Sequence, residues 1–189
     1  MTIRLATGAD LDALVALEAR EWQAELIPGQ RGALMTGQHF GRQELSELIQ
    51  KHWLLLAERG GEIAGYVIAG HWSFFGEWPL YRSLVKRLET SRFEMPQGMV
   101  GASNSCQYGP IWIAPSQRGT GLFAELVAEL KTRIAPQYPY MVTFIAEDNE
   151  RSFAAHTQKG RMQVLDFFEF DGRGYYLLAT ATTTTTTWA

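Results

Sequence analysis

The residues whose types and spacing suggest chemistry lie together near the middle of the chain. An apolar run, Ile111-Trp112-Ile113, is followed by a glycine-rich turn, Arg118-Gly119-Thr120-Gly121, and then by an apolar helix that begins near Leu122. The first N–H groups of a helix have no partners within it, and with the positive end of the helix dipole they favour an anion. Glycine lets a ligand approach this backbone closely. The pattern predicts a cradle for a pyrophosphate.

A strand and a helix must position this turn. The β-branched and aromatic run 111–113 is typical of a buried strand, and Pro115 ends it because proline lacks an N–H. The helix is indicated by apolar residues at helical spacing. These are Leu122, Leu126, Val127, Leu130 and Ile134.

Other cradles match this segment less well. Residues 119–124, GTGLFA, satisfy the dinucleotide pattern G-x-G-x-x-G/A, but Ala114–Arg118 separates the strand from the glycines. Too little chain follows the helix to build a second nucleotide-binding half. No Gly-Lys-Ser/Thr is present, which excludes the nucleoside-triphosphate loop. A turn whose glycines serve no ligand stays an alternative.

A second constellation follows the strand expected at 140–146. Asn149 is predicted to cap a helix that Gly160 ends, with Ser152 in its first turn and His156 seven residues after Asn149.

Together the two segments resemble the motifs of the GNAT N-acetyltransferases. Arg118, Gly121 and Phe123 fall on the three defined positions of the first motif, although Phe123 replaces a small residue. Asn149, Ser152 and Gly160 match the second motif, in which His156 stands where the family usually has tyrosine. The resemblance implies an α/β fold: a single GNAT-like domain with a mixed, centrally splayed sheet flanked by helices.

The resemblance also implies acetyl-CoA as co-substrate. In the family the pantetheine arm pairs with the strand, the turn amides take the pyrophosphate, and the asparagine bonds the pantetheine. The residues assigned to acetyl-CoA are therefore Ile111, Trp112, Ile113, Arg118, Gly119, Thr120, Gly121, Leu122, Phe123, Asn149, Ser152 and Lys159.

The catalytic groups are less regular. By analogy with the usual tyrosine, His156 is expected to protonate the departing thiolate. The strand offers no carboxylate, so Glu147 is the nearest candidate for the general base, with Asp148, Glu58 and Glu94 as alternatives. No residue in the motif would activate Cys106 as a nucleophile, and the four histidines are too scattered to predict a metal site.

The remaining elements fit one domain over residues 1–179. Strand, helix, helix and two strands are expected in order, with Gly60-Gly61 as a hairpin turn and Thr7 and Asp10 at the first helix start. An aromatic-rich insertion covers about 71–105, with one helix and a loop at Met99–Ser105. A threonine-rich tail occupies 180–189, where no role is assigned.

The insertion is a candidate wall of the acceptor pocket. Trp72, Phe75 and Trp78, with Tyr108 on the strand, are predicted to contact the substrate. Alternatively these rings pad the sheet or form a homodimer contact.

Composition excludes several classes of protein. A net charge of −3 argues against a nucleic-acid partner, and no apolar run is long enough to span a membrane. One cysteine and no signal-peptide pattern predict a cytoplasmic protein. We therefore expect transfer of acetyl from acetyl-CoA to a small-molecule or amino-acid-like amine. A non-catalytic CoA-binding domain and a protein-modifying acetyltransferase are the alternatives.

Overall fold

The computed structural model describes residues 1–25 and 39–183. Within these residues, seven strands form one mixed sheet in the order β1-β2-β3-β6-β7-β9-β8. These strands are β1 (Thr2–Leu5), β2 (Trp53–Arg59), β3 (Glu62–Gly70), β6 (Ser105–Ile113), β7 (Tyr140–Ala146), β8 (Gln163–Phe170) and β9 (Arg173–Ala181). The helices are α1 (Leu11–Glu25), α2 (Arg42–Lys51), α3 (Pro79–Thr90), α4 (Leu122–Ile134) and α5 (Glu150–Ala154). The α/β fold with a mixed sheet is therefore confirmed.

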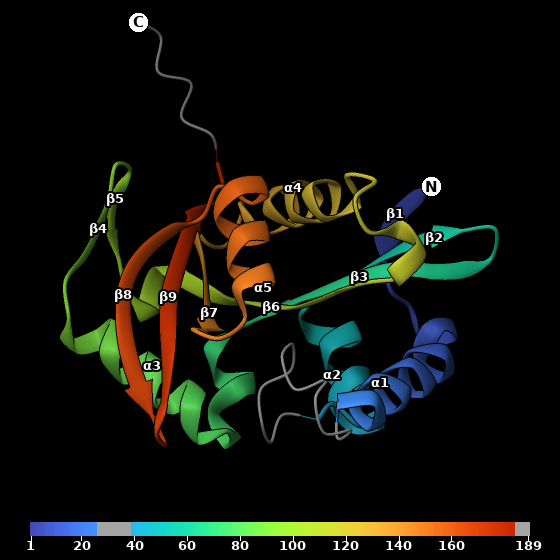
Figure 1. Cartoon of the computed structure of the whole chain (residues 1–189), viewed down its shortest axis with the longest axis horizontal. Helices are drawn as coiled ribbons and strands as arrows, with labels where there is room; N and C mark the ends of the chain where they lie inside the picture. Colours follow the sequence, from blue (N-terminus) through green and yellow to red (C-terminus); the bar gives the residue numbers. More distant parts are fainter. Residues whose placement is uncertain (26–38, 184–189) are drawn as a thin grey trace, which may run out of the picture.

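Helices cover both faces of the sheet (Figure 1). Helix α4 packs on one face through Leu122, Leu126 and Leu130, which belong to one core cluster. Helices α1, α2 and α3 pack on the opposite face and share the second cluster. We call these the α4 face and the α1 face.

The sheet has two halves that diverge in the middle (Figure 1). Strand β6 continues the antiparallel half β1-β2-β3, and β7 begins the half that contains β9 and β8. Their parallel pairing joins Ser105–Gln107 to Tyr140–Val142. In the described chain no pairing with β7 continues over Tyr108–Ile113, so that edge of β6 is open. Gly109, at a φ of 98°, lies where β6 changes register against β3.

Local sequence signals position the other elements as expected. Gly60 and Gly61 form the β2–β3 turn at φ values of 61° and 82°, which side chains disfavour. Strand β7 has the predicted bounds. Asn149 accepts a hydrogen bond from the N–H of Ser152 at 3.2 Å and caps α5, and Gly160 ends the turn that follows.

The insertion and the tail differ in part from the prediction. Helix α3 is the expected helix, but the predicted loop at Met99–Ser105 is wrong in part. Strand β5 (Gly98–Val100) pairs with β4 (Phe93–Met95) as a separate hairpin, and Ser105 already belongs to β6. Thr180 and Ala181 extend β9 because Met141 and Tyr140 of β7 pair with them. Residues 26–38, whose Pro28-Gly29 pair is typical of a break after the first helix, and residues 184–189 lie outside the described residues.

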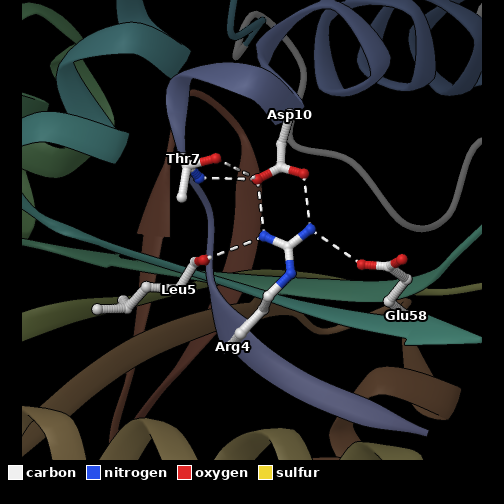
Figure 2. A network of polar contacts seen from close by, with 5 residues as sticks. All are labelled: Arg4, Leu5, Thr7, Asp10 and Glu58. Carbon is white, nitrogen blue, oxygen red and sulfur yellow. Dashed lines mark hydrogen bonds and ion pairs between the residues drawn. The ribbon is translucent and has the colours of Figure 1, made fainter. Parts of the chain in front are cut away.

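A polar network fixes the start of the chain against β2 (Figure 2). The guanidinium of Arg4 donates to both oxygens of Asp10 at 2.8 Å and to Glu58 at 2.9 Å. Asp10 also accepts from the N–H of Thr7 at 2.8 Å, which confirms the predicted helix start. The bonds from Arg4 hold the pKa of Asp10 well below its usual range.

Replacing Asp10 with asparagine should lower the free energy of unfolding by about 1–2 kcal/mol, because the cap and a charge-assisted pair are weakened together. The lowered pKa means that the carboxylate stabilises the fold above about pH 4, its ordinary unfolded pKa. This stabilisation is lost as the pH falls further. Urea denaturation of both proteins at pH 7 and at pH 3 measures the difference, which should shrink at the lower pH. Asp12→Asn is the control, because the Asp12 side chain is 85% exposed and its surface ion pair with Arg42 should contribute little. An equal loss in both variants would contradict the network's role.

Candidate cofactor cleft

One cavity, with a volume of about 380 Å³, opens where β6, α4 and α5 meet. Its lining contains every residue predicted to hold acetyl-CoA except Thr120, together with His156. The hydroxyl of Thr120 instead donates to the Gln117 carbonyl at 2.7 Å, which closes the turn. Gln117, Arg151 and Ala155 also line the cavity. Sequence reasoning missed these three, although each is within four positions of a predicted residue.

The floor of the cleft is backbone. Gly119 and Gly121 adopt φ values of 81° and 93°, and a Cβ placed on either would meet no protein atom within 4 Å. The space in front of both glycines is therefore open, directly before the free N–H groups that begin α4. This arrangement fits an extended anion such as a pyrophosphate.

Positive side chains line the same cavity as this floor. Arg118, Arg151 and Lys159 line the cavity. The Nε of Arg118 donates to the Ile113 carbonyl at 3.3 Å, which holds this arginine beside the end of β6. Three cations around helix-terminal amides favour a ligand with several phosphate charges.

Helix α5 continues into a π-helical turn, Ala155–Lys159, that carries His156. The ring is 4% exposed and lies between Phe123 and Tyr108, with edge-on centroid distances of 5.0 and 5.4 Å. Its Nδ1 lies 2.7 Å from the carbonyl oxygen of Ser152, to which it donates when protonated there. The other nitrogen, Nε2, is then the acceptor in the neutral ring.

Burial lowers the pKa of His156 to about 4. At pH 7 only about one ring in a thousand would carry the extra proton. The expected proton donor is therefore mostly neutral in the folded protein, and it can first accept a proton before giving one away.

Tyr108, predicted to contact substrate, lies behind His156 and is completely buried. Burial raises the pKa of its hydroxyl, and this hydroxyl has no hydrogen-bond partner among the described residues. It does not line the cavity. Its placement makes Tyr108 a support for the histidine ring.

The aromatic insertion packs mainly into the core of the α1 face. Phe75 is completely buried and stacks on Tyr81 at 4.7 Å. Trp78 contacts both rings, and Trp72 donates from Nε1 to the Ser105 hydroxyl at 3.2 Å. None of the three predicted substrate contacts, Trp72, Phe75 or Trp78, lines the cleft. The padding alternative fits this placement.

The carboxylates named from the sequence also lie outside the cleft lining. Glu147 is exposed beside Gly174 in the β8–β9 hairpin. Asp148 pairs with Arg173 at 2.7 Å, and Glu58 pairs with Arg4. Glu94 is exposed on β4.

A buried carboxylate that sequence reasoning missed lies on α1. Glu18 is 6% exposed and accepts a hydrogen bond from the hydroxyl of Tyr66 on β3. The signal was present: Glu18 continues the helical spacing of Leu11, Leu14 and Val15, so it falls on the buried stripe.

Several solved structures with the same architecture are named as acetyltransferases. A Salmonella typhimurium protein solved with acetyl-CoA has a TM-score of 0.63 at 17% identity, covering 98% of this chain and 95% of that one. A GNAT superfamily phosphinothricin acetyltransferase from Sinorhizobium meliloti, in complex with acetyl-CoA, has a TM-score of 0.63 at 18% identity over 99% and 94%. The ribosomal-protein-alanine N-acetyltransferase from Brucella melitensis has a TM-score of 0.63 at 20% identity over 96% and 99%. The chain therefore has the fold of the GNAT acetyltransferases.

No family model and no curated protein matches the sequence. Among the described residues, no helix has both the length and the apolar character needed to cross a membrane.

Replacing His156 with glutamine should flatten the acid dependence of stability. The folded pKa of about 4 lies below the ordinary value near 6.5, so between these pH values the unfolded chain binds more protons. The free energy of unfolding should therefore decrease as the pH is lowered through this window, and His156 should contribute about 1.4 kcal/mol per pH unit. Urea denaturation from about pH 4.5 to pH 7 measures this slope. The exposed His39 provides the control, His39→Gln. A slope that His156→Gln leaves unchanged would contradict the burial of a neutral ring.

Proposed function

We propose that this chain is an N-acetyltransferase that transfers the acetyl group of acetyl-CoA to the primary amine of a small molecule. The observation that carries the proposal is the cleft itself, in which the open edge of β6 meets a glycine floor at the start of α4. The two motifs that line it are far apart in the sequence. Solved structures with this fold contain acetyl-CoA.

In this proposal, different residues of the cleft bind different parts of acetyl-CoA. The N–H groups at the start of α4 and the side chains of Arg118, Arg151 and Lys159 hold phosphate charge. The open backbone edge at Tyr108–Ile113 offers hydrogen bonds to an extended amide-containing arm. Asn149 uses its side-chain oxygen for the helix cap, so its amide N–H₂ group remains to donate.

Catalysis then depends mainly on placement. Holding a neutral amine against the thioester carbonyl replaces a bimolecular encounter, which can lower the activation free energy by several kcal/mol. Backbone donors on the open edge stabilise the oxyanion as charge develops. Pro110 has no N–H, so these donors come from the other residues of that edge.

His156 handles the proton in this proposal. Its Nδ1–H is held by the Ser152 carbonyl, so Nε2 of the neutral ring accepts the proton that the attacking amine loses. The resulting imidazolium is then a strong enough acid to protonate the departing thiolate, whose pKa is about 8.5 by analogy with cysteine. Because burial lowers the pKa of His156, the imidazolium gives up its proton readily and the ring returns to its neutral form. This order of events uses the histidine as a base first and as an acid second.

A non-catalytic CoA-binding domain is the second candidate. The specific observation that favours it is the cleft lining, which in the described chain contains no carboxylate. A protein-modifying acetyltransferase is also compatible with the fold, because the Brucella melitensis neighbour is named for a ribosomal-protein acceptor.

Binding of acetyl-CoA can be tested at the glycine floor. Wild-type protein at about 100 times the dissociation constant should gain about 2.7 kcal/mol, which is roughly 5–10 °C in the unfolding midpoint. Gly121→Glu should gain nothing, because the side chain enters the phosphate space with a negative charge. Gly172→Glu is matched for charge and strain, since Gly172 has a φ of 74° in the β8–β9 turn, and it should keep the full gain. NAD serves as the unrelated ligand. An equal gain in both variants would contradict the binding of pyrophosphate at the glycine floor.

Turnover separates the enzyme from the CoA-binding domain. His156→Gln should reduce kcat by about 100-fold, the usual contribution of a positioned acid or base. The affinity for acetyl-CoA should change little, because the phosphate-binding groups are untouched. Thiol release measures kcat, and the thermal shift measures binding. Thr157→Val, which alters the next residue of the same turn, should retain activity. An unchanged kcat in His156→Gln would contradict proton transfer by this histidine.

A further inference from the structure

Phe123 stands where the first motif is expected to hold a small residue, and its ring lines the cofactor cleft. It is the second residue of α4, whereas His156 belongs to the π-helical turn that follows α5. The two rings meet edge-on with their centroids 5.0 Å apart. The size of this side chain therefore brings the start of α4 into direct contact with the histidine.

The imidazole of His156 has one aromatic neighbour toward the protein interior and one toward the cleft. The inner neighbour is Tyr108, which is completely buried and does not line the cavity. The outer neighbour is Phe123, which does line it. Between them His156 is only 4% exposed. Protein closes the inner side, so water approaches the ring from the cleft, and Phe123 covers the ring there.

The hydrogen bonds of His156 leave one ring nitrogen for chemistry. Nδ1 lies 2.7 Å from the carbonyl oxygen of Ser152 and 3.3 Å from its hydroxyl oxygen. A carbonyl oxygen only accepts, so Nδ1 carries the hydrogen in this contact. Nε2 makes no hydrogen bond within the described residues. In the neutral ring Nε2 therefore has a free lone pair, and it accepts a proton only as long as the ring stays neutral.

We propose that Phe123 is a positioning residue for His156: its ring keeps water away from the cleft side of the imidazole, and Nε2 thereby stays unprotonated in mildly acidic solution. Phe123 thus extends the pH range in which His156 is a base. The proposal rests on the proposed acetyl transfer, and it adds the residue on which the state of the base depends.

The physical basis is desolvation. Enclosing an imidazole disfavours its charged form, because the cation loses the water that would solvate it. Burial is the larger cause of the lowered pKa of His156, which is about 4, and the hydrogen bond to the Ser152 backbone acts in the opposite direction. An aromatic side chain that excludes water has the same effect, without any charge of its own.

The other ionisable side chains around the ring do not respond in the same pH window. Those that touch it or share the cavity lining are Tyr108, Arg118, Arg151 and Lys159. Burial raises the pKa of Tyr108. Arginine and lysine side chains ordinarily stay charged from about pH 4 to about pH 8. Within the described lining, a change in protonation in this window therefore belongs to His156.

The test removes the ring and measures protonation directly. Phe123→Ala opens the cleft side of the imidazole, and Phe123→Leu keeps an apolar side chain there. Phe153→Ala is the matched control, because Phe153 packs on Tyr176 at 4.6 Å and does not line the cavity. NMR titration of the imidazole C2–H signals in the ligand-free full chain gives the pKa, and His156→Gln identifies the signal.

In the wild-type protein and in Phe153→Ala the pKa of His156 should be about 4. Phe123→Ala should raise this pKa most of the way to the ordinary value near 6.5, because water then solvates the imidazolium. Phe123→Leu should leave the pKa close to that of the wild type, because an aliphatic side chain also excludes water.

The pH profile of kcat/KM is a second readout, and a merely structural role would not move it. With a pKa near 6.5, only about one ring in ten is neutral at pH 5.5. The ratio of kcat/KM at pH 5.5 to that at pH 7.5 should therefore be about 10-fold lower in Phe123→Ala than in the wild type. Protonation of the amine affects both proteins equally and cancels in this comparison. The thermal shift by acetyl-CoA at each pH reports cofactor binding separately.

Two results would overturn the proposal. One is an unchanged pKa of His156 in Phe123→Ala, and the other is an equal rise in Phe153→Ala, which would indicate general loosening of the fold. If Phe123→Ala does not fold, Phe123→Gln brings a polar group to the same face of the ring, and an unchanged pKa there is equally decisive.

The outcome for Phe123 is separate from the outcome for acetyl transfer. A raised pKa in Phe123→Ala of a protein that acetylates no amine would keep the effect of the ring contact and would contradict the transferase function. An unchanged pKa in an active enzyme would do the reverse. The two failures are therefore distinguishable.

Discussion

The structure depends on one interruption in a hydrogen-bonded ladder. Strands β6 and β7 pair in parallel at Ser105–Gln107 and then separate, which leaves backbone groups of Tyr108–Ile113 without strand partners on that side. Buried backbone groups must be paired, so such an edge persists only where a ligand or water completes it. Helix α4 directs its N-terminus toward the opening, and the π-helical turn that follows α5 places His156 beside it.

The cleft shows how packing sets the chemical state of a residue. The ring of His156 is held between Phe123 and Tyr108, and the same enclosure that orients it removes the water that would stabilise its charge. Phe123, which departs from the small residue of the family motif, is therefore part of the environment of the histidine that departs from the usual tyrosine. Phe123 and His156, the two residues that depart from the family motifs, are in direct ring contact.

Local patterns predicted much of this structure. The turn before α4, the cap at Asn149 and the Gly60-Gly61 hairpin depend on backbone conformation over a few residues, and each is in the expected place. The burial of Phe75 and the bond between Glu18 and Tyr66 depend on contacts between distant segments. Sequence spacing alone did not assign these. The pKa of His156 could not be predicted either, because it follows from burial rather than from residue type.

The floor of the cleft has a consequence for how such a protein changes over evolutionary time. Its binding groups are largely main-chain amides and a strand edge, and these remain when side chains are exchanged. Identities of 17–20% to solved structures of the same fold are what such a design permits. A comparison of residues alone then loses the relationship long before the architecture does.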